Sequence, residues 1–157
     1  MGTGLGPGEV LLSTVQESSM KRLILIPFDQ LNTQYGALRT GNRQTDAIVL
    51  VESSRMVQGR GWHKQRLHFL LSSARHFAEE LKADGWAATY VKADTTVSGL
   101  QQAQERYRAN HVVCATPNSY VMRAELERAG VSFVPNDFFL TSPDQFSTWV
   151  SKYRSPT

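Results

Sequence analysis

Short apolar runs alternate along the chain with segments whose apolar residues recur every three or four positions. The runs over residues 21–28 and 46–51 are largely apolar and show no polar alternation. This pattern is typical of strands covered by helices on both faces of a sheet. Shorter runs predict further strands over 86–92, 111–115 and 131–135. The pattern therefore indicates five strands.

The clearest helix is predicted between Trp62 and Gly85. Its apolar residues form one stripe at the i, i+3, i+4, i+7 spacing of an amphipathic helix, and Gly85 supplies a C-terminal stop. The stripe consists of Leu67, Leu70, Leu71, Ala74, Phe77, Ala78 and Leu81.

Three more helices are predicted, over about 97–109, in the segment that ends at Ala129, and over 143–152. Each of the last two is preceded by polar residues that can cap a helix, and a glycine or a proline marks one of its ends. These candidate caps and end markers are Asn118, Ser119, Gly130, Thr141, Ser142 and Pro143.

Strands and helices alternate throughout, which predicts right-handed crossovers and helices on both faces of a parallel sheet. The fold class is therefore α/β, with a Rossmann-like five-stranded parallel sheet in the order 3-2-1-4-5. Ligands of such sheets bind at the carboxyl ends of the strands, in the crevice where the winding direction reverses. This rule directs attention to Phe28–Leu31 and Thr116–Asn118, with Glu52–Met56 beside them.

One domain is expected over residues 20–157, because a chain of 157 residues can build one good core but not two. Residues 1–19 are expected to form a flexible N-terminal extension outside the fold. Their glycine-rich start lacks the basic and long apolar regions of a secretory signal. A vector remnant or an upstream start codon would explain this stretch equally well.

Composition narrows the class of protein. Hydrophobic residues make up 41% and charged residues 20%, an ordinary soluble balance, and no apolar run is long enough to cross a bilayer. The net charge of +3 is too mild to argue for a nucleic-acid partner. A single cysteine, Cys114, excludes an internal disulfide and an iron–sulfur cluster held by this chain alone. We therefore expect a cytoplasmic protein with Cys114 buried as a small hydrophobe.

Several motifs of well-known enzymes are missing. No Gly-x-Gly-x-x-Gly follows the first strand, and there is neither a Walker-type Gly-Lys-Ser/Thr nor a Gly-x-Ser-x-Gly elbow. The four histidines, at positions 63, 68, 76 and 111, show no metal-ligand spacing with acidic partners. The residues alone therefore predict a ligand-binding domain without a catalytic constellation or a metal site.

The ends of the first two strands carry the most specific polar side chains. Asp29 and Gln30 could offer paired acceptors and donors to a heterocycle edge or a ribityl chain. Alternatively, Asp29 caps the following turn and Gln30 faces water. Glu52 could accept from ligand hydroxyls, or it could simply pair with a basic neighbour such as Arg55.

The glycine-bearing loop before the long helix offers a third candidate. Trp62 could stack on a flat ring, while His63 or Lys64 binds a polar rim, and the helix start presents free N–H groups to an anion. The alternative is an exposed loop with a polar first helical turn.

These residues also carry a family resemblance, which runs from about Met20 to Tyr153. The segments that carry it are Leu23–Leu31, Val49–Ser53, His63–Leu67, Leu71–Leu81, Gly85–Trp86 and Pro135–Leu140, followed by Phe146 and Trp149. In these segments the chain resembles the deoxyribodipyrimidine photolyase-related proteins, a bacterial cryptochrome and (6-4) photolyase group that carries an iron–sulfur cluster.

The resemblance implies the N-terminal antenna domain of a DNA repair protein, not catalytic by itself. In such proteins this domain can hold 6,7-dimethyl-8-ribityllumazine, which passes excitation to FAD. A large helical domain follows, which binds FAD, the iron–sulfur cluster and damaged DNA. That domain is absent from this sequence, so we expect a fragment or a truncated product, monomeric, with a small-molecule chromophore as its partner and DNA only through the missing domain.

Site residues follow partly from the strand ends and partly from the resemblance. The residues expected to bind the cofactor are Phe28, Asp29, Gln30, Leu31, Glu52, Ser53, Met56, Trp62, His63, Lys64 and Thr116. Antenna-binding members have a glutamate and a tyrosine where this chain has Met56 and Gly59. Another chromophore, or none, is therefore an alternative. Further alternatives are a stand-alone nucleotide- or small-ligand-binding module and a structural domain that docks a partner subunit.

Overall fold

The computed structural model describes residues 21–59 and 61–153, so the extension expected over residues 1–19 lies outside the described part of the chain. Within that part, five strands form one all-parallel sheet in the order β3-β2-β1-β4-β5. The α/β fold class and the predicted strand order are confirmed. The strands are β1 Arg22–Leu25, β2 Asp46–Ser53, β3 Ala87–Ala93, β4 His111–Ala115 and β5 Ser132–Val134.

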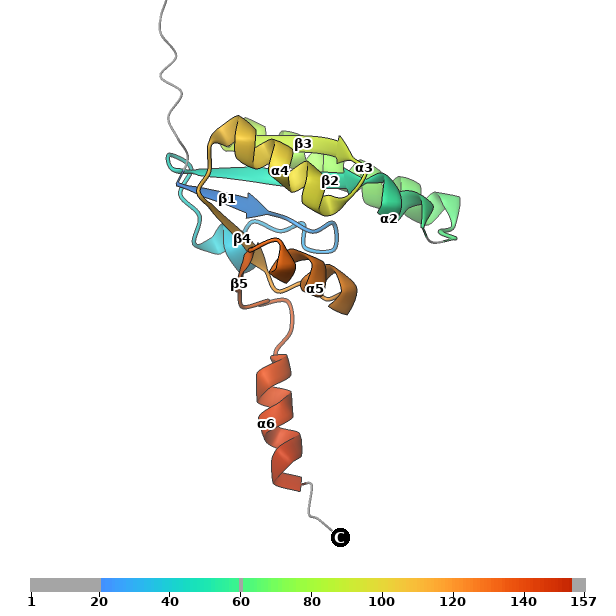
Figure 1. Cartoon of the computed structure of the whole chain (residues 1–157), viewed down its shortest axis with the longest axis vertical. Helices are drawn as coiled ribbons and strands as arrows, with labels where there is room; N and C mark the ends of the chain where they lie inside the picture. The colour runs from blue at the N-terminus through green and yellow to red at the C-terminus, as the bar shows by residue number, and fades with distance from the viewer. Residues whose placement is uncertain (1–20, 60, 154–157) are drawn as a thin grey trace, which may run out of the picture.

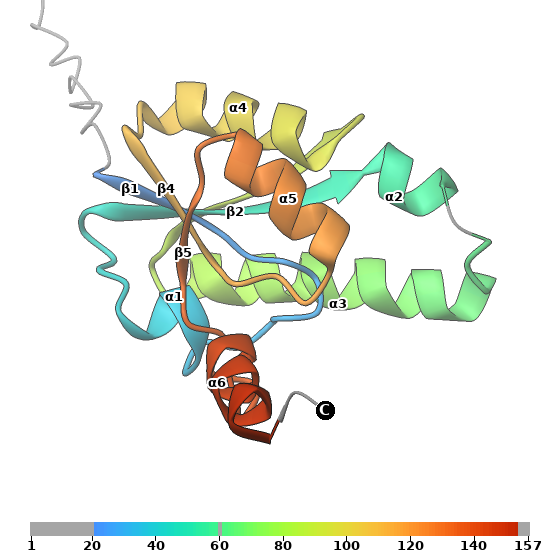
Figure 2. The same cartoon turned by 60° about the horizontal axis from the view of Figure 1, so that its bottom comes forward.

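Helices lie on both faces of the sheet, as Figure 2 shows. α1 and α3 pack on one face against Ile24 and Ile48, whereas α4 and α5 pack on the other against Leu23 and Val49. The helices are α1 Gly36–Arg39, α2 Ser54–Gln58, α3 Lys64–Ala83, α4 Thr96–Tyr107, α5 Tyr120–Arg128 and α6 Pro143–Tyr153.

Two strand ends differ from the sequence prediction. β1 ends at Leu25, before Pro27, which has no N–H to donate to a neighbouring strand. β2 continues two residues past its apolar run to Ser53, because β3 pairs with it over the full length from Ala47 to Ser53. The side chains at the end of β2 are therefore held on a strand and not on a loop.

The predicted stripe of α3 is buried over only half of its length. Ala74, Ala78 and Leu81 are inaccessible to solvent or nearly so, whereas Leu67 and Leu70 in the first half are only half-buried. Figure 2 shows the reason: α3 continues past the end of β2 toward α2, so its first turns have no sheet above them.

α6 stands apart from the layered body and points away along the long axis of the molecule (Figure 1). None of its residues is buried. Ser142 and Gln145 exchange two hydrogen bonds at its start, with Ser142 Oγ accepting from Gln145 N and Gln145 Oε1 accepting from Ser142 N. Ser142, one of the two predicted caps, therefore begins this helix.

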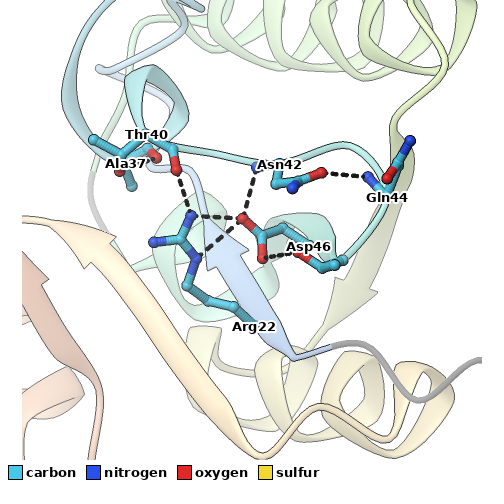
Figure 3. Close-up of polar contacts among 7 residues, drawn as sticks. Arg22, Ala37, Thr40, Asn42, Gln44 and Asp46 are labelled. Atoms are coloured by element: carbon cyan, nitrogen blue, oxygen red, sulfur yellow. Dashed lines mark hydrogen bonds and ion pairs between the residues drawn. The ribbon is translucent and has the colours of Figure 1, made fainter.

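The amino ends of β1 and β2 are joined by an ion pair that sequence reasoning did not find. Arg22 donates from Nη2 and Nε to Asp46 Oδ2 over 2.5 and 3.1 Å, and Asn42 N donates to the same oxygen over 2.9 Å (Figure 3). Arg22 also donates to Thr40 O over 2.9 Å. This network fixes the edge of the sheet opposite the expected ligand edge.

Candidate functional site

The crevice between β1 and β4 is bridged by amide side chains. Gln30 is 4% exposed, and its Nε2 donates to Thr116 O over 3.2 Å. Asn136 Nδ2 donates to the same carbonyl over 2.9 Å. Asn118 Nδ2 donates to Asp29 Oδ2 over 2.9 Å. The alternative in which Gln30 faces water is therefore wrong, and Asp29 bonds across to the loop after β4.

These hydrogen bonds leave little space at the expected crevice. The cavity beside Gln30 and Ala115 measures about 10 Å³, which is room for one water molecule. A chromophore between β1 and β4 would have to displace Gln30 from Thr116. The other polar side chains of the carboxyl edge lie beside β2 and β3.

There, Glu52 is the centre of a polar and aromatic cluster. Its Oε2 accepts from Tyr90 Oη over 2.5 Å and from Arg75 Nη2 over 2.6 Å. The Arg75 guanidinium lies 5.7 Å from the centre of the Tyr90 ring, and Phe28 stacks on that ring at 6.0 Å and 16°. The loop after β1, the strands β2 and β3, and α3 each contribute one of these side chains, which we call the Glu52 cluster.

The partner of Glu52 differs from the one suggested by the sequence. Arg55 follows Glu52 closely in the chain, but its Nη1 pairs with Glu125 of α5 at 3.0 Å. Arg75 reaches Glu52 because α3 crosses the same face of the sheet on which Glu52 and Tyr90 lie. The prediction from sequence proximity that Arg55 pairs with Glu52 is therefore wrong, and the partner is Arg75.

The cluster holds fixed protonation states at neutral pH. Burial raises the pKa of Glu52, but the hydrogen bonds from Tyr90 and Arg75, with the charges of Arg75 and Lys92, outweigh it and leave the pKa below its usual range. Burial, together with donation to the Glu52 carboxylate, raises the pKa of Tyr90. Acid–base catalysis works best with a pKa near the working pH, so this cluster suits binding and orientation.

α2 begins at the end of β2 and positions a second group of expected site residues. Ser53 Oγ accepts from Met56 N over 3.3 Å and donates to Asp94 O over 3.2 Å. Trp62 Nε1 donates to Met56 O over 3.0 Å. Arg66 lies 4.7 Å from the centre of the Trp62 ring, so the indole is bonded to α2 and has a guanidinium over its ring.

The end of α2 has no room for a side chain at Gly59. A Cβ at that position would lie 2.4 Å from Arg55 O, which receives the Gly59 N–H. His63 is the N-cap of α3, with Nδ1 accepting from Gln65 N over 3.4 Å, and Lys64 is exposed in the first turn. His63 therefore takes up one of the free N–H groups of the helix start that the sequence had suggested for an anion.

Leu31 belongs to none of these groups. It lines an open groove of about 460 Å³ along α3, the rest of which is formed by His68, Phe69, Ser72, Ser73, His76, Phe77 and Glu80. We call this surface the α3 groove.

The structure thus does not gather the expected site residues in one place. It joins Phe28 to Glu52, connects Ser53, Met56 and Trp62 around α2, and ties Asp29, Gln30 and Thr116 into the closed crevice. Leu31 lies in the α3 groove, and His63 and Lys64 lie at the start of α3. Sequence reasoning missed Tyr90, Arg75 and Asn136. Tyr90 could have been found from alternation along β3. It pairs with Leu50 and lies two residues before Lys92, the register partner of Glu52, so Tyr90 and Glu52 share one face of the sheet.

Among residues 21–59 and 61–153, no group of three His, Cys, Asp or Glu side chains could hold a metal ion. In the same ranges, no helix is both long and apolar enough to cross a bilayer. Cys114 is buried in β4, and burial raises the pKa of its thiol to about 12, so it behaves as a packing residue, as expected.

The fold and these side chains define a Rossmann-like α/β domain whose polar and aromatic groups gather at the carboxyl ends of β1, β2 and β3. The chain belongs to the deoxyribodipyrimidine photo-lyase-related protein family, whose model matches residues 24–157. It is 29% identical over 150 residues to a (6-4) photolyase of Agrobacterium fabrum (strain C58 / ATCC 33970). The match covers 88% of this chain and 30% of that relative, so the chain spans less than a third of the relative's length.

Proposed function

We propose that this chain is a chromophore-binding antenna domain of a photolyase-related DNA repair protein and is not catalytic by itself. The observation that carries the proposal is the match to the photolyase-related family over nearly all of the described chain. The Glu52 cluster supports it, because an anionic acceptor and an aromatic pair at the carboxyl edge of a parallel sheet suit a flat ligand with hydroxyl groups.

The proposed ligand is 6,7-dimethyl-8-ribityllumazine. Both hydrogen bonds within the cluster end on Glu52 Oε2, so ribityl hydroxyls would donate to Oε1. Phe28 and Tyr90, which already stack in parallel, would pack against the ring system. Ser53 and Met56, directly after Glu52, would border the site.

The repair chemistry is proposed to lie in another domain, which would bind FAD, an iron–sulfur cluster and DNA. This chain has one cysteine, and an iron–sulfur cluster needs several thiolates. A cytoplasmic location is part of the proposal and rests on that single, buried and unpaired cysteine.

The direct test is reconstitution of the 157-residue chain with 6,7-dimethyl-8-ribityllumazine, followed by desalting and a visible absorption spectrum. We expect the chromophore to stay with the protein. Titration followed by lumazine fluorescence anisotropy should give a Kd that Glu52→Gln raises about tenfold, because a charge-assisted hydrogen bond becomes a neutral one. Glu127→Gln, on the exposed face of α5, is the matched control and should leave the Kd unchanged.

Colourless protein after desalting would contradict the antenna proposal. A thermal-shift series with nucleotides and flavins would then be informative: a selective rise in Tm with an adenine nucleotide would identify a nucleotide-binding module instead. Equal Kd values for the wild type and Glu52→Gln would move the binding site away from the Glu52 cluster.

A further inference from the structure

The Glu52 cluster and its surroundings carry more positive than negative charge. Glu52 is the carboxylate of the cluster, and the positive charges of Arg75 and Lys92 both lie close enough to stabilise its ionised form. Two cations therefore face one anion at the carboxyl end of β2, which leaves one positive charge without a balancing carboxylate.

Lys92 lies on the same face of the sheet as Glu52. It is the register partner of Glu52 where β3 runs parallel to β2, and side chains alternate between the two faces along each strand. Lys92 is exposed. Within the described chain Glu52 pairs with Arg75, and no carboxylate forms an ion pair with Lys92.

Arg75 can bind a second anion while it holds Glu52. Its Nη2 donates to Glu52 Oε2 over 2.6 Å, and a guanidinium has five N–H donors in all. The Arg75 side chain is 47% exposed, so a ligand can reach it from solvent.

The acidic residues nearest to these two cations have other partners. Glu79, one turn after Arg75 on α3, pairs with Lys82 at 2.8 Å. Asp94, which follows β3, accepts from Ser54 Oγ over 3.4 Å. Neither of them forms an ion pair with Arg75 or Lys92 within the described chain.

α3 extends the positive charge beyond the sheet. The sequence has no Asp or Glu between Glu52 and Glu79. Lys64 precedes Arg75 by eleven positions, or about three helical turns, so both lie on the same side of the helix. The first turns of α3 run past the end of β2 (Figure 2). Lys64 therefore adds to a positive field that attracts anions toward the carboxyl edge.

The groups of the site follow the order of the strands. Phe28 comes after β1, Glu52 is on β2 and Lys92 is on β3, and these three strands are neighbours in the sheet. A ligand with its ring on Phe28 and its hydroxyls at Glu52 would place its far end beside Lys92. A phosphate at that end would gain charge-assisted hydrogen bonds, which an uncharged end cannot form.

We propose that the Glu52 cluster prefers ligands with an anionic end, namely a phosphate ester on the polyol chain, which Lys92 and Arg75 bind. This inference rests on the chromophore-binding function proposed above and deepens it, because an uncharged ribityl chain leaves Lys92 unused.

Riboflavin and riboflavin 5′-phosphate test the proposal, because they share a ring system and a ribityl chain and differ in the phosphate. Titration of the 157-residue chain with each, followed by flavin fluorescence anisotropy, should give a Kd at least about tenfold lower for the phosphate ester. Added NaCl should reduce this difference, because salt screens exposed charges. Inorganic phosphate should weaken the binding of the ester and leave riboflavin unaffected.

Variants of Lys92 separate the phosphate contact from the rest of the site. Lys92→Gln should bring the two Kd values to within about threefold of each other and leave the Kd of riboflavin unchanged. Lys92→Arg keeps the charge and should keep the difference. Lys82→Gln is the matched control, since Lys82 is an exposed cation in the last turn of α3, and both Kd values should stay as in the wild type.

Equal Kd values for the two flavins would overturn the proposal, and so would a preference that Lys92→Gln leaves intact. Failure of both flavins to bind would overturn it as well. If inorganic phosphate bound as tightly as the ester, phosphate would be recognised without the ring, which also contradicts the proposal. The antenna function is judged separately: 6,7-dimethyl-8-ribityllumazine that binds and depends on Glu52 supports that function even if the two flavins bind equally.

Discussion

At the scale of single residues, Asp46 is a buried carboxylate whose ionised form is stabilised by the fold. It is 3% exposed, and its Oδ2 accepts from Arg22 and from Asn42 N. Burial raises the pKa of Asp46, but the hydrogen bonds and the charge of Arg22 outweigh that effect and bring the pKa below its ordinary value of 3.8. The folded state therefore favours the ionised form more than the unfolded state does.

Asp46→Asn should lower the free energy of unfolding by about 2 kcal/mol at neutral pH, because Arg22 loses its partner at a largely buried position. The folded-state pKa is lowered, so this contribution is present above pH 3.8 and is lost as the pH falls below that value. Urea unfolding at several pH values should show the wild type and the variant converging in acid. Glu127→Gln, from the exposed Arg123–Glu127 pair, should cost under about 0.5 kcal/mol. If the difference in unfolding free energy between the wild type and Asp46→Asn stayed the same at low pH, the lowered pKa of Asp46 would be contradicted.

The sequence predicted the position of Glu52 better than it predicted the partners of this side chain. Glu52 lies near the end of β2, as predicted, yet its contacts, Tyr90 and Arg75, lie 38 and 23 positions further along the chain. Such pairings depend on the register of β2 with β3 and on where α3 crosses the sheet. The local pattern of apolar and polar residues determines neither this register nor the position of α3.

At the scale of elements, the long helices were predictable and the short ones were not. α1 and α2 have four and five residues, which is too few to show a helical period. α2 instead owes its start to the Ser53 cap and its end to Gly59. The predicted stop of α3 at Gly85 has a clearer signature, since Gly85 adopts a φ of +84° and follows the last helical turn.

Gly85→Ala should lower the free energy of unfolding by about 1 kcal/mol. A Cβ at this position would meet nothing within 4 Å, so the cost comes only from the left-handed backbone, which disfavours a side chain. Gly61→Ala is a close control, because a Cβ there also meets nothing and its φ is not positive. It should leave stability unchanged or slightly higher. If the two variants gave equal unfolding curves, an alanine at position 85 would cause no backbone strain, and the prediction would be wrong.

At the scale of the whole molecule, the alternation of strands and helices was enough to predict the sheet order. Right-handed crossovers restrict how five parallel strands can be arranged, so the position of the β1–β4 crevice followed as well. What the rule could not predict was that side chains close this crevice. Gln30, Thr116 and Asn136 come from loops up to 106 residues apart in the chain, and their amide and carbonyl groups meet only once the sheet is assembled.

This closure predicts an energetic coupling between distant loops. Thr116 O accepts from both Gln30 and Asn136, so either single alanine variant leaves the carbonyl with one donor. The double variant Gln30→Ala/Asn136→Ala removes both donors, and its loss in unfolding free energy should exceed the sum of the single losses by about 1 kcal/mol. Urea unfolding of all four proteins measures this coupling. Gln30→Ala combined with Lys82→Ala, a distant exposed position, should be additive within about 0.3 kcal/mol. Additivity in the first pair as well would mean that water replaces the lost donors, and the crevice would then be open to solvent and not sealed by its amides.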